Sequence, residues 1–317
     1  MAKKGGSGLR IISLKKNKEI SLDGGSGLCL GHFDGVHRGH LALIEELKRR
    51  GAARNIRLPL GVFLFSTPPT ATLNKAPTPQ LTTLDEKLAL MAAAGLDFAV
   101  LYDFPTIKDM SPSDFINKVL IDECHAKILV CGFNYTFGAK GAGTPTDLGR
   151  LFATREGHDL SVMPPVMDGP YTVSSSLVRA MLSGGHPDDA ARLLGRPYTL
   201  TGQVSEGQGL GRTMGLPTAN LLFPTGALVP MHGVYAVTVR IGKRTYTGIC
   251  NVGVRPTVAT DSGVNCETFI FDFNGDLYGK LVEVSFLYYI REERKFEGLA
   301  ELEAQIRRDI ERAKQYF

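Results

Sequence analysis

Residues 31–40 read Gly31-His32-Phe33-Asp34-Gly35-Val36-His37-Arg38-Gly39-His40. A short apolar run, Leu28-Cys29-Leu30, precedes them, and a segment of helical periodicity follows from about residue 40 to residue 50. Glycine lets the backbone pass close to a ligand, and a helix N-terminus offers unpaired N–H groups with a partial positive charge. The segment therefore predicts a strand–turn–helix connection that binds a phosphate group.

Two histidines, His37 and His40, lie three positions apart in this connection. If both belong to the first helical turn, they share a face of the helix. Two imidazoles placed there could stabilise the charge that develops on a departing pyrophosphate. The alternative is that the two histidines cap the helix and have no chemical role.

The first half of the chain alternates apolar segments with amphipathic ones. Strands are expected at residues 58–65, 98–101 and 128–130, with a second helix beginning at Asp85. This βαβ alternation predicts a parallel sheet covered by helices. A short helix is expected between Ser174-Ser175-Ser176 and Gly184-Gly185. We place the domain boundary after it, giving a first domain of residues 1–186 and a second of residues 187–317.

The second half has a different texture. Turn residues separate five segments of strand character, at residues 198–204, 234–241, 245–252, 267–273 and 281–289. Short strands with turn signals between them predict an antiparallel β-barrel or sandwich. A helix follows near the C-terminus, whose apolar stripe comprises Leu299, Leu302, Ile306, Ile310 and Ala313.

The composition suits a two-domain protein that handles small anions. The chain has 317 residues, of which 43% are hydrophobic, and its 36 basic and 32 acidic residues leave a net charge of +4. No basic stripe supports nucleic-acid binding, and no apolar run approaches the ~18 residues that span a bilayer. The five cysteines form no CxxC pair, so we expect reduced thiols and a cytoplasmic protein.

A second phosphate-handling site is indicated in the second half. Residues 207–212 read Gly-Gln-Gly-Leu-Gly-Arg, and the backbone around Gly209, Gly211 and Arg212 could cradle a phosphate, although a plain β-turn is the alternative. Thr218 and Asn220 are two apart, so in an extended segment both side chains face the same way. Their oxygens suit Mg²⁺ bound to ATP, and Glu267 downstream could accept a proton from an attacking hydroxyl.

The first of these regions resembles a known family. Residues 31–40 are similar to the signature of the adenylyltransferase module in bacterial bifunctional riboflavin kinase/FAD synthetases, a variant of the HxGH motif of nucleotidylyltransferases. Residues 132–138 (Gly-Phe-Asn-Tyr-Thr-Phe-Gly) resemble the family's Gly-x-(Asp/Asn)-Phe-x-Phe-Gly loop, and residues 173–179 resemble its Ile-Ser-Ser-Thr-x-x-Arg segment. The resemblance implies that Ser175 and Arg179 hold the ATP phosphates, although a surface salt bridge is the alternative for Arg179. It also implies substrate or ATP contacts at Gly31, Phe33, Asp34, Gly39 and Asn134.

The second region resembles the same family's kinase module. Residues 211–220 match its pattern Gly-Arg-x-x-Gly-x-Pro-Thr-Ala-Asn, and the match continues in order at residues 251–257, 267–268, 276–279 and 290–296. By this resemblance Thr218 and Asn220 hold MgATP, Glu267 is the general base, and Arg291 borders the flavin pocket. The implied fold is an α/β nucleotidylyltransferase (Rossmann-like) domain followed by an antiparallel β-barrel riboflavin kinase domain with a C-terminal helix.

The implied activity is phosphorylation of riboflavin to FMN with ATP and Mg²⁺, followed by adenylylation of FMN to FAD with release of pyrophosphate. One departure affects the first domain, because residues 64–69 read Leu-Phe-Ser-Thr-Pro-Pro where the family has Thr-Phe-Asp-Pro-His-Pro. It motivates an alternative, a riboflavin kinase with a weak or inactive adenylyltransferase domain. A second alternative is a flavin-binding regulator that does not turn over.

Overall fold

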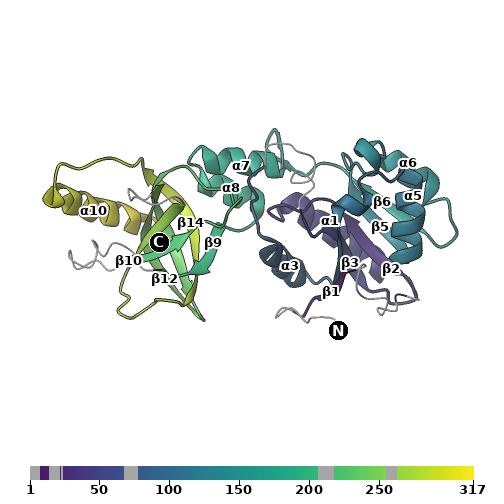
Figure 1. The fold of residues 1–317 in the computed structure, drawn as a ribbon, viewed down its shortest axis with the longest axis horizontal. Helices are drawn as coiled ribbons and strands as arrows, with labels where there is room; N and C mark the ends of the chain where they lie inside the picture. The colour runs from purple at the N-terminus through teal and green to yellow at the C-terminus, as the bar shows by residue number, and fades with distance from the viewer. Residues whose placement is uncertain (1–7, 14–21, 23, 68–77, 206–217, 255–262) are drawn as a thin grey trace. The chain divides into compact units, whose positions relative to one another are not determined.

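The computed structural model describes residues 8–13, 22, 24–67, 78–205, 218–254 and 263–317. The chain divides into two compact units, with the division between Val173 and Ser174 (Figure 1). Residues 174–186, which the sequence led us to place in the first domain, fall within the second of these units.

The first unit is built on a six-stranded parallel sheet with the order β1-β4-β3-β2-β5-β6. Three of these strands, β2, β3 and β4, agree with the predicted segments to within two residues, and β5 extends the predicted one in both directions. The strands are β1 (Arg10–Ser13), β2 (Ser26–Leu30), β3 (Leu60–Phe65), β4 (Phe98–Tyr102), β5 (Ala126–Gly132) and β6 (Asp159–Met163).

Helices cover both faces of this sheet, as Figure 1 shows for α1 and α3 on one side and α5 and α6 on the other. Alternate residues of β2 enter different cores, because Cys29 packs with α1 and α3 whereas Leu28 and Leu30 pack on the other face. The covering helices are α1 (Arg38–Ala52), α3 (Leu84–Ala93), α5 (Pro112–Asp114), the π-helical segment η1 (Phe115–Glu123) and α6 (Pro145–Leu151). The predicted helix-covered parallel sheet is thus confirmed.

Local sequence signals set several boundaries in this unit. At the start of α3, the Thr83 side chain accepts from the Glu86 backbone N–H while the Glu86 carboxylate accepts from the Thr83 N–H, a reciprocal capping box. Ser111 is the N-cap of α5, and its hydroxyl accepts a single hydrogen bond from the Asp114 backbone N–H. Smaller elements complete the unit: α4 (Phe104–Ile107), η2 (Ala139–Gly141) and the hairpin of β7 (Met167–Asp168) and β8 (Tyr171–Thr172).

The strand order reverses direction between β2 and β5. The chain leaves β2 toward β3 on one side, whereas β5 pairs with β2 on the other. Ligands in open α/β sheets bind at the carboxyl ends of the strands where the order reverses. Residues 31–37 and residues 133–138 follow β2 and β5 directly, so the topology brings two of the predicted motifs to this edge.

The second unit is an antiparallel barrel with the order β10-β13-β12-β11-β14-β9. A bridge between Ser205 and Asn220 joins the end of β9 to the other edge strand, β10, with Ser205 N–H donating to Asn220 O over 2.9 Å. The strands are β9 (Tyr198–Gln203), β10 (Thr218–Leu222), β11 (Gly233–Ile241), β12 (Arg244–Val254), β13 (Val264–Ile270) and β14 (Leu281–Arg291).

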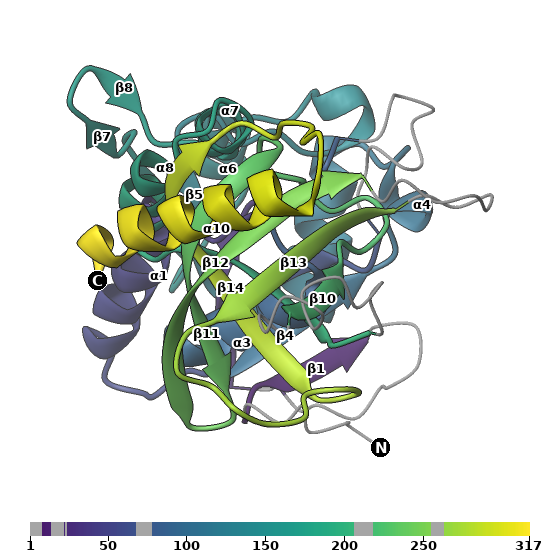
Figure 2. The ribbon, with the colours of Figure 1, turned by 90° about the vertical axis from the view of Figure 1, so that its left-hand side faces the viewer.

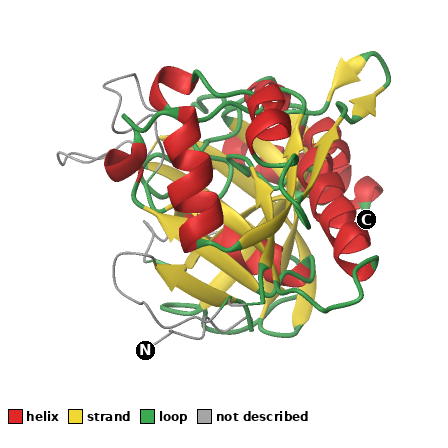
Figure 3. Ribbon diagram, turned by 90° about the vertical axis from the view of Figure 1, so that its right-hand side faces the viewer, coloured by secondary structure: helices red, strands yellow, loops and turns green. Residues whose placement is uncertain are grey.

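Alternation along β11 separates two apolar layers. Tyr235 and Val237 are fully buried in one layer. Val234 and Ala236 belong to the other layer, which packs beneath α10 (Leu299–Ala313). This helix lies across the strands in Figure 2. The helices and strands of the chain are distinguished by colour in Figure 3. The unit also contains α7 (Ser175–Ser183), α8 (Pro187–Leu194) and η3 (Lys314–Tyr316).

Two expectations about this unit were inaccurate. β13 ends at Ile270 rather than at residue 273, because the chain turns at Asp272, whose φ is 53°. Leu299, expected in the apolar stripe of α10, is 61% exposed, since the first turn of that helix extends beyond the barrel cluster.

Within the described part of the chain, none of the helices is long and apolar enough to cross a membrane. The five cysteines are all buried free thiols.

Candidate active sites

The connection after β2 has an uncommon backbone. Phe33 and Val36 have φ values of 53° and 41°, which side chains with a Cβ rarely adopt, and Gly35 has a φ of 77°. The Asp34 carboxylate accepts from the backbone N–H groups of Leu81 (3.0 Å) and Thr82 (3.3 Å). Asp34, predicted as a binding residue, therefore anchors this loop to the segment before α3.

The two predicted histidines lie together at the start of α1. His37 is the N-cap residue, and its ring stacks on that of His40 with 3.7 Å between centroids and 16° between planes. A Cβ at Gly39 would come within 3.1 Å of the His37 ring, so glycine makes room for the stack. The shared face expected from the spacing is present. Gly31, the other predicted glycine, joins β2 to this loop.

Burial and neighbouring cations set the charge of this site. The pKa of His40 lies well below its ordinary value, first because burial disfavours the imidazolium and then because His37 and Lys87 are close. Burial also lowers the pKa of Lys87, whose ammonium donates to His32 O over 3.2 Å. His40 is therefore neutral near pH 7, and its ring can donate a hydrogen bond without carrying a charge.

The loop after β5 supplies the other predicted motif at this edge. Tyr135 N–H donates to Gly132 O over 3.1 Å, closing a turn that places Asn134 at the surface. A Cβ at Gly132 would meet Asn134 Oδ1 at 3.3 Å, so the amide side chain lies back over the strand end. Ser175 and Arg179 lie in the first two turns of α7, within the second unit, and their role with ATP stays a prediction.

The departure noted at residues 64–69 falls partly on described residues. Ser66 follows β3 and donates its backbone N–H to Tyr102 O over 2.9 Å. Pro68 and Pro69 lie outside the described residues.

In the second unit, three predicted residues meet on two neighbouring strands. Asn220 of β10 is paired directly with Glu267 of β13, and the Thr218 hydroxyl donates to Glu267 Oε1 over 2.7 Å. Thr218 and Glu267 are half-buried. The other predicted phosphate contacts, Gly209, Gly211 and Arg212, lie outside the described residues.

Asn265 was not identified from the sequence. Its Nδ2 donates to Asn220 Oδ1 over 2.8 Å, it is only 7% exposed, and its own Oδ1 has no hydrogen-bond partner in the described part of the chain. Asn265 lies two positions before Glu267 on β13, so strand alternation would have placed it on the same face.

Two cavities adjoin this group and share Thr218 as a wall residue. The first, here called the α10 cavity, has a volume of about 220 Å³ and is bounded by Glu267, Asn251, Glu293 and an apolar wall. That wall comprises Val234, Ile249, Phe269, Phe296, Leu302 and Ile306. The second, the turn cavity, has a volume of about 540 Å³ and is bounded by residues 273–278 together with Ala219 and Ile270.

Arg291, predicted to border a flavin pocket, lines the α10 cavity and fixes the helix over it. Its Nε and Nη2 donate to the buried carboxylate of Asp309, at 2.9 and 2.7 Å from Oδ2. Gln305 Nε2 donates to the other oxygen of Asp309 over 2.8 Å. A bidentate pair of this kind fixes orientation as well as distance.

A further polar pair borders the same cavity. Asn251 Nδ2 donates to Glu293 Oε1 over 2.8 Å, and a Cβ at Gly253 would overlap the Glu293 carboxylate. Asn251 is opposite Glu267 in the β12–β13 register, so its amide lies beside the proposed base. Both residues fell within matched segments, but the sequence assigned them no role.

Among the described residues, no group of three or more His, Cys, Asp or Glu side chains is arranged to hold a metal ion.

Two family models match successive parts of the chain. A family model described as FAD synthetase matches residues 20–177, and one described as riboflavin kinase matches residues 194–317. A solved structure from Streptococcus pneumoniae, described as a macrolide-efflux protein, is 32% identical, with a TM-score of 0.85 over 97% of this chain and 99% of its own.

Curated relatives match over nearly their whole length. Proteins named bifunctional riboflavin kinase/FMN adenylyltransferase are 37% identical in Escherichia coli K12, 34% in Bacillus subtilis and 32% in Listeria monocytogenes. Each match covers 92% of this chain and 92–93% of the relative. The chain belongs to the family of bifunctional riboflavin kinase/FMN adenylyltransferases.

Proposed function

We propose that this chain phosphorylates riboflavin to FMN in its barrel and adenylylates FMN to FAD in its α/β unit. Membership of the family and the presence of both matched regions support the pair of activities. The observation that carries the kinase assignment is the Thr218–Glu267 contact on the wall shared by two cavities.

In the kinase reaction, the apolar wall of the α10 cavity receives the flavin ring and the turn cavity receives ATP. The ribityl 5′-hydroxyl then lies beside Glu267, which takes its proton as the oxygen attacks the γ-phosphorus and ADP leaves. Asn251, oriented by Glu293, offers its amide oxygen to the flavin on the same face. The cavities thereby place the acceptor and the donor on either side of Thr218.

Mg²⁺ fits the residues present. The Thr218 hydroxyl donates a hydrogen bond to Glu267, so the lone pairs of the Thr218 oxygen remain available, and Asn220 adds an amide oxygen. When bound with ATP, Mg²⁺ neutralises phosphate charge. The glycine loop with Gly209, Gly211 and Arg212 is proposed to hold the same phosphates.

In the adenylylation, a phosphate oxygen of FMN attacks the α-phosphorus of ATP and pyrophosphate leaves. The stacked His37 and His40 are proposed to donate hydrogen bonds to the charge that develops on this leaving group. Gly31, Phe33 and Gly39 shape the phosphate-binding turn, and Asn134 contacts substrate from the neighbouring strand end. Ser175 and Arg179 are proposed to hold the ATP phosphates.

The substrates are small molecules, flavins and ATP, and we place the activity in the cytoplasm, where five free thiols remain reduced. A second candidate function is a riboflavin kinase alone. It is favoured by the sequence at residues 64–69, where Ser66 and Pro68 stand in place of the family's acidic residue and histidine.

A chromatographic time course with the purified protein, riboflavin, ATP and Mg²⁺, repeated from FMN, tests the proposal. We expect FMN to rise first and FAD to follow, and FAD to form without delay when FMN is supplied. Accumulation of FMN with no FAD from either start would select the kinase alone. Binding of flavin without ATP consumption would overturn both activities.

A further inference from the structure

The amino-terminal edge of the parallel sheet carries a cavity away from the strand ends discussed above. It has a volume of about 360 Å³. It lies where Arg54, just beyond the end of α1, approaches the start of β5 and Gly157, which comes just before β6. Its wall includes Arg54, Asn55, Lys127 and Gly157, and no carboxylate lines it within the described part of the chain. We call it the amino-edge cavity.

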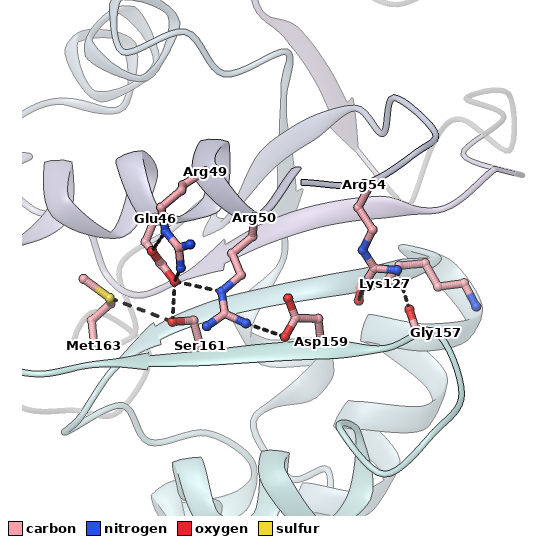
Figure 4. Close-up of polar contacts among 9 residues, drawn as sticks. All are labelled: Glu46, Arg49, Arg50, Arg54, Lys127, Gly157, Asp159, Ser161 and Met163. Atoms are coloured by element: carbon pink, nitrogen blue, oxygen red, sulfur yellow. Dashed lines mark hydrogen bonds and ion pairs between the residues drawn. The ribbon is translucent and has the colours of Figure 1, made fainter. Parts of the chain in front are cut away.

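Backbone carbonyl groups hold the Arg54 guanidinium in one orientation. Nη1 donates to Gly157 O over 2.9 Å and Nη2 to Lys127 O over 3.4 Å, as Figure 4 shows. The neighbouring cations on α1 have a carboxylate partner instead, because Arg49 and Arg50 both donate to Glu46. The guanidinium of Arg54 is thus held in place by neutral carbonyl groups, which leave its positive charge without a carboxylate to balance it.

Lys127 supplies a second cation to the same cavity. Its Cγ lies 2.6 Å from where a Cβ of Gly25 would stand, so the absence of a side chain at Gly25 gives the lysine stem its place. Figure 4 shows its ammonium extending away from the Arg54 contact, and the described residues provide it with neither a hydrogen bond nor an ion pair. Asp122 lines an adjoining cavity that also contacts Lys127, but not this one.

His158 lines the adjoining cavity together with Lys127, and its ring senses the charge of Lys127 and Arg54. Its Nδ1 lies 3.0 Å from Glu156 O, and its Nε2 is buried with no hydrogen-bond partner among the described residues. The pKa of His158 is lowered, first by burial and then, against the raising effect of the Glu156 carbonyl, by Lys127, Arg155 and Arg54. One fixed guanidinium, one ammonium and a destabilised imidazolium mark a place where positive charge lacks a neighbouring anion.

We propose that the amino-edge cavity binds a phosphate group through Arg54 and Lys127. The guanidinium fork offers its remaining N–H donors in a fixed plane, and the ammonium adds a mobile point charge. The site is separate from the stacked histidines, because it adjoins the amino ends of β5 and β6 rather than the carboxyl ends of β2 and β5. It therefore gives this unit a second anion site outside the proposed adenylylation chemistry.

The test is a titration of the full chain with inorganic pyrophosphate, followed by NMR of the histidine ring signals, with AMP as a second probe for an ester-borne phosphate. We expect the His158 signal to move and saturate, and its apparent pKa to rise as an anion offsets Lys127, Arg54 and Arg155. In Lys127→Gln and in Arg54→Gln the dissociation constant read from His158 should rise at least tenfold. Arg49→Gln, which removes a cation that Glu46 already pairs, is the matched control.

Pyrophosphate bound at the proposed adenylylation site moves the His37 and His40 signals instead, and those shifts should persist in both variants. The proposal is overturned if the His158 signal does not respond to either probe, or if it responds equally in wild type and Lys127→Gln. The Lys127 side chain has neither a hydrogen bond nor an ion pair among the described residues, so Lys127→Gln removes a charge and no polar contact there, and it remains informative even if Arg54→Gln is unstable.

Discussion

Asp34 shows how one side chain sustains a strained turn. Its carboxylate accepts two backbone N–H groups from residues 81 and 82, and Phe33 and Val36 keep left-handed φ values beside it. We expect Asp34→Ala to leave those donors unpaired and to lower the free energy of unfolding of the first unit by about 2–4 kcal/mol. FAD formation from FMN should fall at least tenfold while FMN formation is unchanged.

Urea unfolding and the two product assays check this prediction together. A purely substrate-contacting Asp34 would change the KM for ATP or FMN and leave stability intact, which would contradict the anchoring role.

His40 should make stability depend on pH. Its folded pKa lies below that of the unfolded chain, so below pH 6.5 the unfolded state binds more protons and stability falls as the pH falls. We expect His40→Gln to flatten this dependence between pH 6.5 and pH 5, by as much as about 1.4 kcal/mol per pH unit. Urea titrations at pH 5, 6.5 and 8 measure it, and parallel curves for the two proteins would refute the assignment.

Asn265 should act on the kinase through Asn220. Asn265→Ala removes the donor to Asn220 Oδ1, so the amide loses its fixed orientation. We expect the KM for MgATP to rise about tenfold while the KM for riboflavin changes little, since Asn265 does not line the α10 cavity. Initial rates at varied MgATP and varied riboflavin separate the two constants, and an equal rise in both would argue for general damage to the barrel.

At the scale of elements, one ion pair holds α10 on the barrel. Asp309 is 3% exposed and receives Arg291 and Gln305 together. We expect Asp309→Ala to leave the Arg291 charge without its partner, which costs about 3 kcal/mol, and to loosen the helix that closes the α10 cavity. Hydrogen exchange of the α10 amides should accelerate and the KM for riboflavin should rise. Unchanged exchange in α10 would show that the apolar cluster alone holds the helix.

Elements with a strong local pattern were predictable from the sequence. The buried run at Leu28 to Leu30, the helix after it and the barrel strand from residue 281 all lie close to their expected places, because hydrophobic period and turn residues set them. The strands β1, β6 and β10 were not predicted, since polar residues interrupt the short apolar runs that marked β2 and β4. The π-helical form of residues 115–123 likewise has no signal in apolar spacing.

The sites were predictable as motifs but not as contacts. Spacing along the chain placed His37 with His40 and Thr218 with Asn220. The partners of Asp34 lie 47 and 48 positions away, and Arg291 meets Asp309 from another element. Such pairs are made by packing, so the sequence predicted only ligand roles for Asp34 and Arg291 and did not indicate the structural contacts that each makes.

At the scale of the whole molecule, the chain is two units with two separate sets of reactive groups. The first unit offers neutral imidazoles and backbone turns at a parallel sheet edge, and the second offers a carboxylate beside two cavities in a barrel. Relatives in the family are named for both activities, and the central claim is that the stacked histidines serve adenylylation whereas Glu267 serves phosphorylation.

Crossed variants test that claim most directly. Glu267→Gln and the double variant His37→Ala/His40→Ala would each be assayed by chromatography, once from riboflavin and once from FMN. Glu283→Gln, the same change at a barrel carboxylate that pairs with Arg240, is the control. Glu267→Gln should lose about 10²–10⁴-fold in FMN formation yet convert supplied FMN to FAD at the wild-type rate. The double variant should accumulate FMN normally and form no FAD. Near-normal FMN formation by Glu267→Gln would contradict the account. So would failure of Glu267→Gln to convert supplied FMN to FAD, or loss of FMN formation in the double variant.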